Sequence, residues 1–495
     1  MRFWRALICI GIICCLSCSA FAKNKKNRRR AVSPPASAVY GTQNLVSGIN
    51  RIIQSTDSYD TTIGVVIKSM KHGDVLYSKN DQKLFVPAST LKILTAEAAL
   101  LYLGPDFKFK TRFLTNAKAV DNGVLDGNLY LVHSGDPSLT YSDLADLVAA
   151  LRSQQIREVV GNIYIDNSAY DQVNHGPGWL WDDKKSCYGA PINASIINHN
   201  CLSFTLLPSN TPGNAAEIVP NPRESFTPVI NEVVTKPRHT RSCYLRLGET
   251  ENDLLSISGC IPKGGYARGI STVVTDAVQY NKMLLSDLFH RFGIKVSGEI
   301  TAGTAPPDLS TLATHESKPL QQLISDMLKK SDNIIAGSLL KKMGEIFTRS
   351  PGTWENGGNA VEHILSQKAS VDIWRMNVID GSGLSRYNQV TPSQMLQVLD
   401  FAFHNYATNY DFISALPIAG VDGTLKHRMR NILRKVRAKT GTMSGIVSLA
   451  GYTVSADKEP VAFVIMVNGR NGYGWKYREM EDKIVTLLTK YKRAG

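Results

Sequence analysis

The chain has 495 residues, of which 43% are hydrophobic and 20% charged. This composition excludes a disordered or collagen-like chain, and the length predicts two or three domains. The formal net charge is +14, but residues 1–30 hold eight basic residues and no acids, so residues 31–495 carry only +6. A body this mildly basic disfavours nucleic acid as a partner.

Residues 1–22 have the pattern of an export signal. Arg2 and Arg5 form a charged start, an apolar stretch covers residues 6–16, and Ala20-Phe21-Ala22 matches an Ala-x-Ala cleavage site. The apolar stretch is short for a spanning helix, which needs about 20 residues, so an uncleaved anchor is the weaker interpretation. No later segment has the length and uniform apolarity of a membrane span.

Residues 23–44 follow as a predicted linker, basic at first and then rich in Pro and Ser. One interpretation of its basic part, residues 23–30, is a solvated tail. The other is weak electrostatic contact with an anionic membrane or wall polymer, which added salt would weaken.

The rest of the chain predicts elements in the following order. Strands at 61–69 and 74–78 precede a helix at 90–102. A strand-rich stretch follows, with strands at 109–114, 129–132, 162–165, 202–207, 244–247 and 254–257 and helices at 142–153 and 274–292. Helical patterns return at 320–345, 359–367 and 392–404, before strands at 436–439, 446–453 and 461–467 and a helix near 479–491. This order predicts an α/β domain in two halves, 45–115 and 318–495, split by a β-rich insertion at 116–317.

Four of the eight cysteines lie inside the predicted signal. The other four are Cys187, Cys201, Cys243 and Cys260, and they allow three pairings. The local pairing, 187 with 201 and 243 with 260, is the simplest because both loops are short, and an oxidising compartment would permit both bonds. Zinc binding competes with this interpretation, but neither Cys-x-x-Cys nor His-Glu-x-x-His spacing occurs.

Three short motifs carry the candidate chemistry. They are Ser89-x-x-Lys92, Ser331-Asp332-Asn333 and Lys439-Thr440-Gly441-Thr442. Each is weak by itself, because Ser-x-x-Lys recurs at Ser338 and Ser455 and Ser-x-Asn recurs at residues 78–80. Together and in this order they are typical of class A β-lactamases and penicillin-binding proteins. The ten histidines show no spacing that implies a metal or a Ser-His-Asp triad, and we expect no cofactor.

Ser89 is the candidate nucleophile. It follows Pro87 and opens a strongly helical stretch, with Lys92 on the same helix face. A serine hydroxyl needs a base to take its proton, and a lysine is a base only when neutral, which requires a lowered pKa. Burial and a second cation, Lys439, would both lower that pKa. The alternative is that Ser89 only caps a helix.

The second motif lies between two helical patterns, where side chains reach a cleft. We expect Ser331 to relay a proton to the leaving amine and Asn333 to bond Lys92 and a substrate amide. The alternative is a helix-capping turn.

The third motif lies in a strand pattern. A strand edge pairs with an extended peptide, Lys439 attracts a terminal carboxylate, and the hydroxyls of Thr440 and Thr442 bond it. We expect Gly441 to let the substrate backbone approach. The N–H groups of Ser89 and Thr442 are candidate oxyanion donors.

With these motifs, the sequence resembles the penicillin-binding protein 4 type of D-alanyl-D-alanine carboxypeptidase/endopeptidase (peptidase family S13, class C low-molecular-mass penicillin-binding proteins). The 238 residues between Lys92 and Ser331 suit that family's large insertion, whereas class A β-lactamases have a far shorter spacing. Further matching segments are 103–107, 135–139, 188–191, 380–386 and 416–420. The sequence departs from the family's usual residues at His133-Ser134 and at Thr442, and these departures are small.

The resemblance implies a β-lactamase/transpeptidase-like domain of antiparallel sheet flanked by helices, with two inserted subdomains. It also implies local pairing of the cysteines and a supporting role for residues 380–386 near the cleft. The roles that it implies are nucleophile for Ser89, general base for Lys92, proton relay for Ser331, and substrate binding for Asn333, Lys439, Thr440, Gly441 and Thr442.

The resemblance further implies a periplasmic hydrolase that cleaves D-Ala-terminated and cross-linked stem peptides of peptidoglycan through an acyl-enzyme on Ser89. β-Lactam antibiotics would acylate the same serine, and members of the family are often homodimers. Two alternatives stay open. A β-lactamase or esterase on the same scaffold would deacylate quickly, and a non-catalytic wall-binding protein would release no D-alanine.

Overall fold

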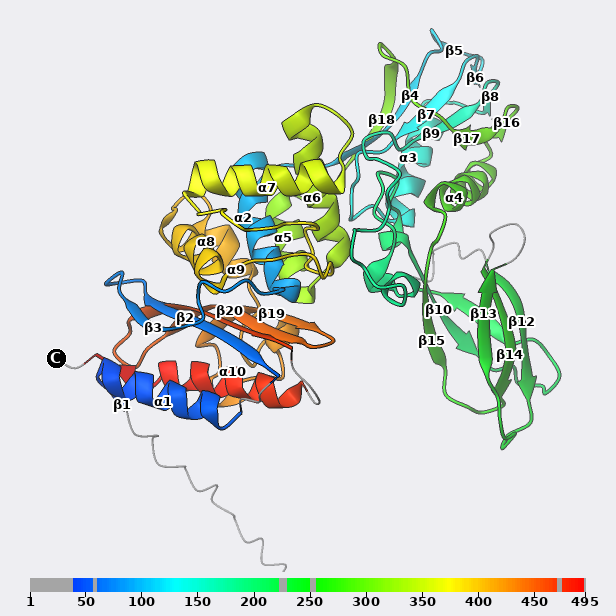
Figure 1. Ribbon diagram of the computed structural model, residues 1–495. Coiled ribbons are helices and arrows are strands. Elements are labelled where there is room, and N and C mark those ends of the chain that lie inside the picture. Colours follow the sequence, from blue (N-terminus) through cyan, green and yellow to red (C-terminus); the bar gives the residue numbers. More distant parts are fainter. Residues whose placement is uncertain (1–38, 57–59, 222–228, 250–254, 470–473, 494–495) are drawn as a thin grey trace, which may run out of the picture. The chain divides into compact units, whose positions relative to one another are not determined.

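Figure 1 shows a computed structural model of the chain, which describes residues 39–56, 60–221, 229–249, 255–469 and 474–493. The predicted signal peptide, 1–22, and residues 23–38 of the predicted linker lie outside the described residues. Within the described ranges, no helix combines the length and apolarity needed to cross a membrane.

A five-stranded antiparallel sheet joins the two ends of the chain. Its strand order is β19 (Val436–Met443), β20 (Ile446–Val454), β21 (Pro460–Asn468), β2 (Thr62–Ser69) and β3 (Val75–Lys79). The register sets Val65 of β2 opposite Ile465 of β21. The two predicted halves therefore form one sheet, and the predicted class, an antiparallel sheet flanked by helices, is confirmed.

Helices cover both faces of this sheet (Figure 1). On one face lie α1 (Thr42–Gln54) and α10 (Trp475–Leu488), joined at their outer ends by the short parallel pair β1 (Val39–Tyr40) and β22 (Tyr491–Lys492). Neighbouring side chains of a strand point to opposite faces, so Val65 packs with Ile484 of α10, whereas Val66 packs into the helical layer on the other face. Because both faces are covered, β20 and β21 are buried along almost their whole length, and their burial does not alternate.

The second face carries a helical layer with α2 (Lys92–Leu103) at its centre. Around it lie α5 (Leu320–Lys330), α6 (Asn333–Thr348), α7 (Trp354–Ala369), α8 (Pro392–His404) and α9 (Asn409–Ala415). Every residue of α2 from Lys92 to Leu100 is buried, as expected of a helix that is surrounded on all sides. The side chain of Lys92, at the start of this helix, is therefore held away from solvent.

The inserted region opens with its own five-stranded sheet. The order of its strands is β17 (Ile300–Ala302), β9 (Ile163–Asp166), β7 (Leu129–Val132), β4 (Lys110–Thr115) and β18 (Ser310–Glu316). A second sheet is formed by strands that fall between these along the chain. Its order is β16 (Lys295–Val296), β8 (Glu158–Val159), β6 (Val124–Leu125) and β5 (Val120–Asp121). The helices α3 (Tyr141–Ser153) and α4 (Ala277–Arg291) share its core. The predicted first half, 45–115, includes β4, but this strand pairs with β7 and β18 because Phe113 belongs to the inserted core. The inserted sheet thus begins at Lys110.

Two three-stranded sheets complete the inserted region. One has the order β11 (Glu217–Pro220), β10 (Cys201–Leu207), β15 (Arg268–Val273), and the other β12 (Val229–Lys236), β14 (Leu255–Pro262), β13 (Leu245–Glu249). Disulfides join Cys187 to Cys201 and Cys243 to Cys260, so the local pairing is confirmed. Between β9 and β10 runs the 167–200 segment, which has only short 3₁₀ turns at 183–185, 187–189 and 198–200.

Candidate active site

Ser89 lies in a 3₁₀ turn, Ala88–Leu91, and the α-helix α2 begins only at Lys92. The helical stretch that Ser89 was expected to open is thus present, and its first turn is 3₁₀ rather than α. Two hydrogen bonds hold the start of this turn, because Ser448 Oγ and Thr90 Oγ1 each donate to the carbonyl of Pro87 at 2.7 Å. This fixes a half-buried serine at the surface end of a buried helix.

Lys92 is fully buried and contacts residues from three separate stretches of the chain. Its Nζ lies 3.1 Å from Ser89 Oγ, 2.6 Å from Asn333 Oδ1 and 2.7 Å from the carbonyl oxygen of Ser382. Burial lowers the pKa of the Lys92 amine to about 7, against the opposing influence of Asp380 and Asp332. A substantial fraction of the amine is therefore neutral near neutral pH.

The neutral amine has two hydrogens and one lone pair. The oxygens of Asn333 and Ser382 accept hydrogen bonds but donate none, so they take both hydrogens. The lone pair is then left for the third neighbour, Ser89 Oγ. This is the geometry required for a base that takes the proton of the serine hydroxyl.

Lys439 is also fully buried, and its Nζ donates to Ser331 Oγ and to the carbonyl of Thr440, each at 2.8 Å. Burial, and then the positive charge of Lys92, lower the pKa of Lys439 well below its usual value. We expected burial and Lys439 together to lower the pKa of Lys92; burial does lower it, but Lys439 is not among the causes.

The motif at 331–333 spans the connection between α5 and α6, which consists of Ser331 and Asp332, and the first residue of α6, Asn333. Ser331 ends α5 with a positive φ of 61°, and Asp332 caps α6 by accepting from the N–H groups of Ile334 and Ile335. The capping interpretation is thus true of Asp332, while the hydroxyl of Ser331 and the amide of Asn333 meet the two lysines.

The motif at 439–442 lies on β19, one of the two edge strands of the five-stranded sheet. Thr442 is exposed, and Thr440 donates its hydroxyl to Thr424 Oγ1 at 2.8 Å. A Cβ on Gly441 would lie 2.1 Å from Ser448 Oγ and 2.9 Å from the carbonyl of Pro87. The structure therefore requires glycine here to pack β19 against the serine turn, which is not the reason that the sequence suggested.

The three motifs, far apart in the sequence, meet around Ser89 and the two lysines. Residues 45–491 match the model of the D-Ala-D-Ala carboxypeptidase 3 (S13) family. The chain belongs to this family. Its membership confirms the resemblance seen in the sequence and identifies a serine-type D-Ala-D-Ala carboxypeptidase.

Relatives of this S13 carboxypeptidase support the assignment. It is 34% identical over 414 residues to D-alanyl-D-alanine carboxypeptidase DacB of Haemophilus influenzae, covering 83% of this chain and 86% of the relative. The crystal structure of penicillin-binding protein 4 (dacB) from H. influenzae matches with a TM-score of 0.78 and 32% identity, over 90% of this chain and 99% of that one. The same protein complexed with a β-lactam matches with a TM-score of 0.74 and 30% identity, over 90% and 100%.

Two contacts of the S13 site come from residues that the motifs leave out. The first is the carbonyl of Ser382, in the 380–386 loop. Gly383 has a φ of 82°, and a Cβ there would lie 1.9 Å from the carbonyl of Ala88, so only glycine fits beside the serine turn. The sequence offered 380–386 only as a segment that matches the family and supports the cleft, and the structure adds the close approach at Gly383.

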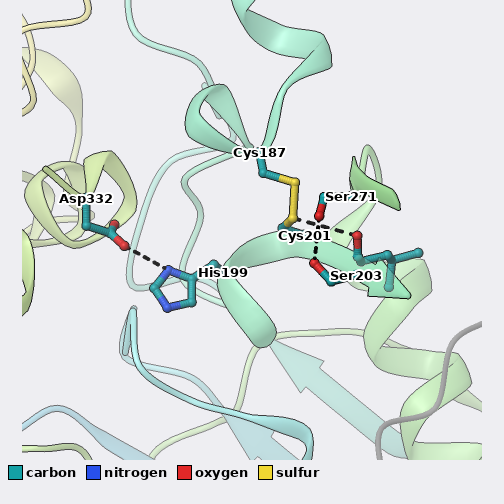
Figure 2. Close-up of a disulfide and its surroundings, with 7 residues drawn as sticks. Cys187, His199, Cys201, Ser203, Ser271 and Asp332 are labelled. Atoms are coloured by element: carbon teal, nitrogen blue, oxygen red, sulfur yellow. Dashed lines mark hydrogen bonds and ion pairs between the residues drawn. A yellow bond between two sulfur atoms is a disulfide. The ribbon is translucent and has the colours of Figure 1, made fainter. Parts of the chain in front are cut away.

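The second is the 167–200 segment of the inserted region. The carbonyl of Tyr188 accepts from Asn333 Nδ2 at 2.8 Å, and His199 Nδ1 lies 3.4 Å from Asp332 Oδ2. Figure 2 shows His199 directed at Asp332 from beside the Cys187–Cys201 disulfide. A backbone carbonyl leaves no residue signal, so motif analysis could not find the Tyr188 contact. Among the residues that the structure describes, no group of three or more His, Cys, Asp or Glu is placed to hold a metal.

Proposed function

We propose that the chain is a DD-carboxypeptidase and DD-endopeptidase that cleaves D-Ala-terminated and cross-linked peptidoglycan stem peptides through an acyl-enzyme on Ser89. The observation that carries the proposal is the three-way contact of Lys92, whose two carbonyl-type acceptors leave its lone pair for the serine hydroxyl. Membership of the S13 family supplies the substrate class.

In the first step Ser89 Oγ attacks the carbonyl carbon before the terminal D-amino acid, and its proton passes to Lys92 Nζ. The substrate lies along β19, where Lys439 attracts its carboxylate and Thr440 and Thr442 bond it. An incoming carboxylate favours the charged form of Lys439. The C–O bond to Ser89 forms a tetrahedral adduct, whose oxyanion faces the N–H groups of Ser89 and Thr442.

The adduct collapses when the leaving nitrogen gains a proton. Ser331 Oγ accepts a hydrogen bond from Lys439, so it can pass its own hydrogen to that nitrogen while the charged amine of Lys439 gives it another. The proton that Lys92 took from Ser89 then restores the charge of Lys439, and both amines end the step as they began it. The C–N bond breaks, D-alanine or the cross-link amine leaves, and water then hydrolyses the ester. A β-lactam follows the same first step, but its leaving nitrogen stays tethered.

The test is Ser89→Ala, measured by labelling with a fluorescent penicillin and by D-alanine release from defined muropeptides. We expect loss of both signals. Ser338→Ala is the matched control, because Ser338 also stands three residues before a lysine, is fully buried and has a hydroxyl without a hydrogen-bond partner in the described structure. Labelling that survives in Ser89→Ala would reject the assignment, and rapid turnover of the penicillin by the unmodified chain would favour a β-lactamase.

We further propose that the enzyme works in the periplasm after cleavage of residues 1–22, with the basic stretch 23–30 in weak contact with anionic membrane or wall. The pattern of the first 22 residues supports export. Mass spectrometry of the periplasmic fraction should find a mature chain that begins at Lys23. A cytosolic chain that begins at Met1 would contradict this.

A further inference from the structure

The carbonyl of Ser382, which takes one hydrogen of Lys92, belongs to a loop that is organised around a single buried carboxylate. Asp380 is fully buried and accepts five hydrogen bonds of 3.0 Å or less. The donors are Ser382 Oγ, the N–H groups of Gly383 and Ser385, Asn388 Nδ2 and Trp179 Nε1. The first four come from the loop and its immediate neighbour.

The fifth donor comes from the inserted region. Trp179 lies in the 167–200 segment, is 7% exposed, and its indole N–H reaches Asp380 Oδ2 at 2.7 Å, the shortest of the five bonds. Two residues earlier, the carbonyl of Pro177 accepts from Ser385 Oγ at 2.6 Å, so the segment holds the loop at two points. A buried carboxylate depends on such donors, because each one that is lost leaves charge without compensation.

We propose that Trp179 is a positioning residue for acyl transfer: its indole N–H fixes Asp380, and Asp380 fixes the Ser382 carbonyl that orients Lys92 toward Ser89. This inference rests on the proposed function of Ser89 and Lys92. Trp179 has no hydrogen bond to either of them in the described structure, and no part of its action requires contact with substrate.

The role has a kinetic consequence. If the Ser382 carbonyl shifts, the lone pair of Lys92 turns away from Ser89 Oγ, and proton transfer slows. The groups expected to bind the substrate carboxylate, on β19, are unaffected. Loss of the indole N–H therefore lowers the rate constant of acylation and leaves the noncovalent binding of penicillin unchanged.

A neighbouring tryptophan provides a matched control. Trp354 is 4% exposed, its ring lies 5.7 Å from that of Trp179, and its Nε1 donates at 2.7 Å to the carbonyl of Val173. Trp179→Phe and Trp354→Phe therefore remove equal volume and one N–H each from the same cluster. Only the first removes a hydrogen bond to Asp380.

The experiment measures penicillin acylation by stopped flow, separating the binding and acylation steps, for the full chain and both variants between pH 5 and 9. A hydrogen bond to a charged group corresponds to about a tenfold change in rate, so we expect about tenfold slower acylation in Trp179→Phe at every pH, with unchanged binding, and a change of less than about twofold in Trp354→Phe. If Trp179→Phe folds poorly, benzothienylalanine at position 179 replaces the N–H by sulfur in nearly the same shape.

Equal losses in the two phenylalanine variants, or no loss in Trp179→Phe and in the benzothienylalanine chain, would overturn the positioning role. Asp380→Asn sharpens the test, since Trp179→Phe should add little to the loss in that background. A wild-type chain that penicillin does not acylate would instead overturn the proposed function itself, so the two failures are distinguishable.

Discussion

The inserted region contains two parts that differ in their relation to the active site. The 167–200 segment hydrogen-bonds the catalytic helices and the 380–386 loop repeatedly, through Lys341, Trp354, Asp380 and Asn333. The described side-chain hydrogen bonds of residues 201–273 instead join residues of that part to one another, and its two sheets have their own small core. Part of an insertion can therefore belong to the catalytic site while the rest folds beside it.

The two disulfides differ in the same way. Cys187 precedes Tyr188, which contacts Asn333, and Cys201 lies two residues after His199, which faces Asp332 (Figure 2). One closed loop thus holds two adjacent residues of the second motif. The Cys243–Cys260 bond closes a loop within the 201–273 part. Chemically similar cross-links should therefore differ in their effect on catalysis.

The largest expected effect comes from breaking the attachment of the 167–200 segment at Lys341. This fully buried lysine on α6 donates to Asp171 Oδ1 at 2.6 Å and to the carbonyls of Val173 and Ile192 at 3.0 and 3.2 Å. Lys341→Met removes this donor from Asp171 and from the Ile192 carbonyl, whereas the Val173 carbonyl keeps its hydrogen bond from Trp354 Nε1. We expect a loss of about 3 kcal/mol in the free energy of unfolding by urea denaturation, and strongly reduced penicillin acylation.

Lys342→Met is the control for this change. Lys342 is almost as buried, but its hydrogen bond goes to Glu345 of the same helix. It should destabilise the protein while acylation by the remaining folded fraction stays near normal. Equal acylation in both folded variants would mean that attachment through Lys341 does not matter to the site.

The second prediction separates the two disulfides. The cysteines are 14 residues apart in one and 17 in the other, so loop closure predicts similar losses of about 3 kcal/mol when either is removed. Cys187→Ser with Cys201→Ser should also slow acylation about tenfold, because the loop that holds Asn333 loosens. Cys243→Ser with Cys260→Ser should not. Denaturation curves and acylation rates of the two double variants decide this, and equal acylation rates would contradict the proposed difference.

The third prediction concerns pH. Because the pKa of Lys92 is lowered to about 7 and the base must be neutral, acylation should rise about tenfold from pH 6 to pH 8 and then level off. The negative charge of Asp380 raises the pKa of Lys92. Asp380→Asn should therefore move the rising limb of the pH profile of acylation to lower pH, while reducing the plateau rate. Glu232→Gln, an exposed change in the 201–273 part, should leave the limb in place. A limb that stays fixed in Asp380→Asn would remove Asp380 from the electrostatics of the base.

The sequence predicted what depends on local pattern. Ser-x-x-Lys on a helix, a Ser-x-Asn connection and a strand with Lys-Thr-Gly each have a period or a residue signature, and the structure brings them together as expected. The sequence misplaced β4, because an amphipathic strand such as Lys110–Thr115 has the same pattern whichever sheet it joins.

The sequence did not reveal the contacts that the inserted region makes with the site. The carbonyl of Tyr188 acts through the backbone, which every residue shares. The bond from Trp179 to Asp380 joins side chains 201 positions apart, and nothing in either local pattern indicates the other. Such contacts follow from the tertiary arrangement alone.

The smallest expected effect comes from His199. Its ion pair with Asp332 spans 3.4 Å, and the histidine side chain is 43% exposed, so solvent screens it and the pair contributes little. His199 and His239 both have positive φ, which asparagine tolerates well, so His199→Asn and His239→Asn are matched changes in the two parts. We expect about twofold slower acylation in His199→Asn, since Asp332 adjoins Asn333, and no change in His239→Asn. A tenfold loss in His199→Asn would mean that this histidine, and not the Tyr188 carbonyl, is the main support of the second motif.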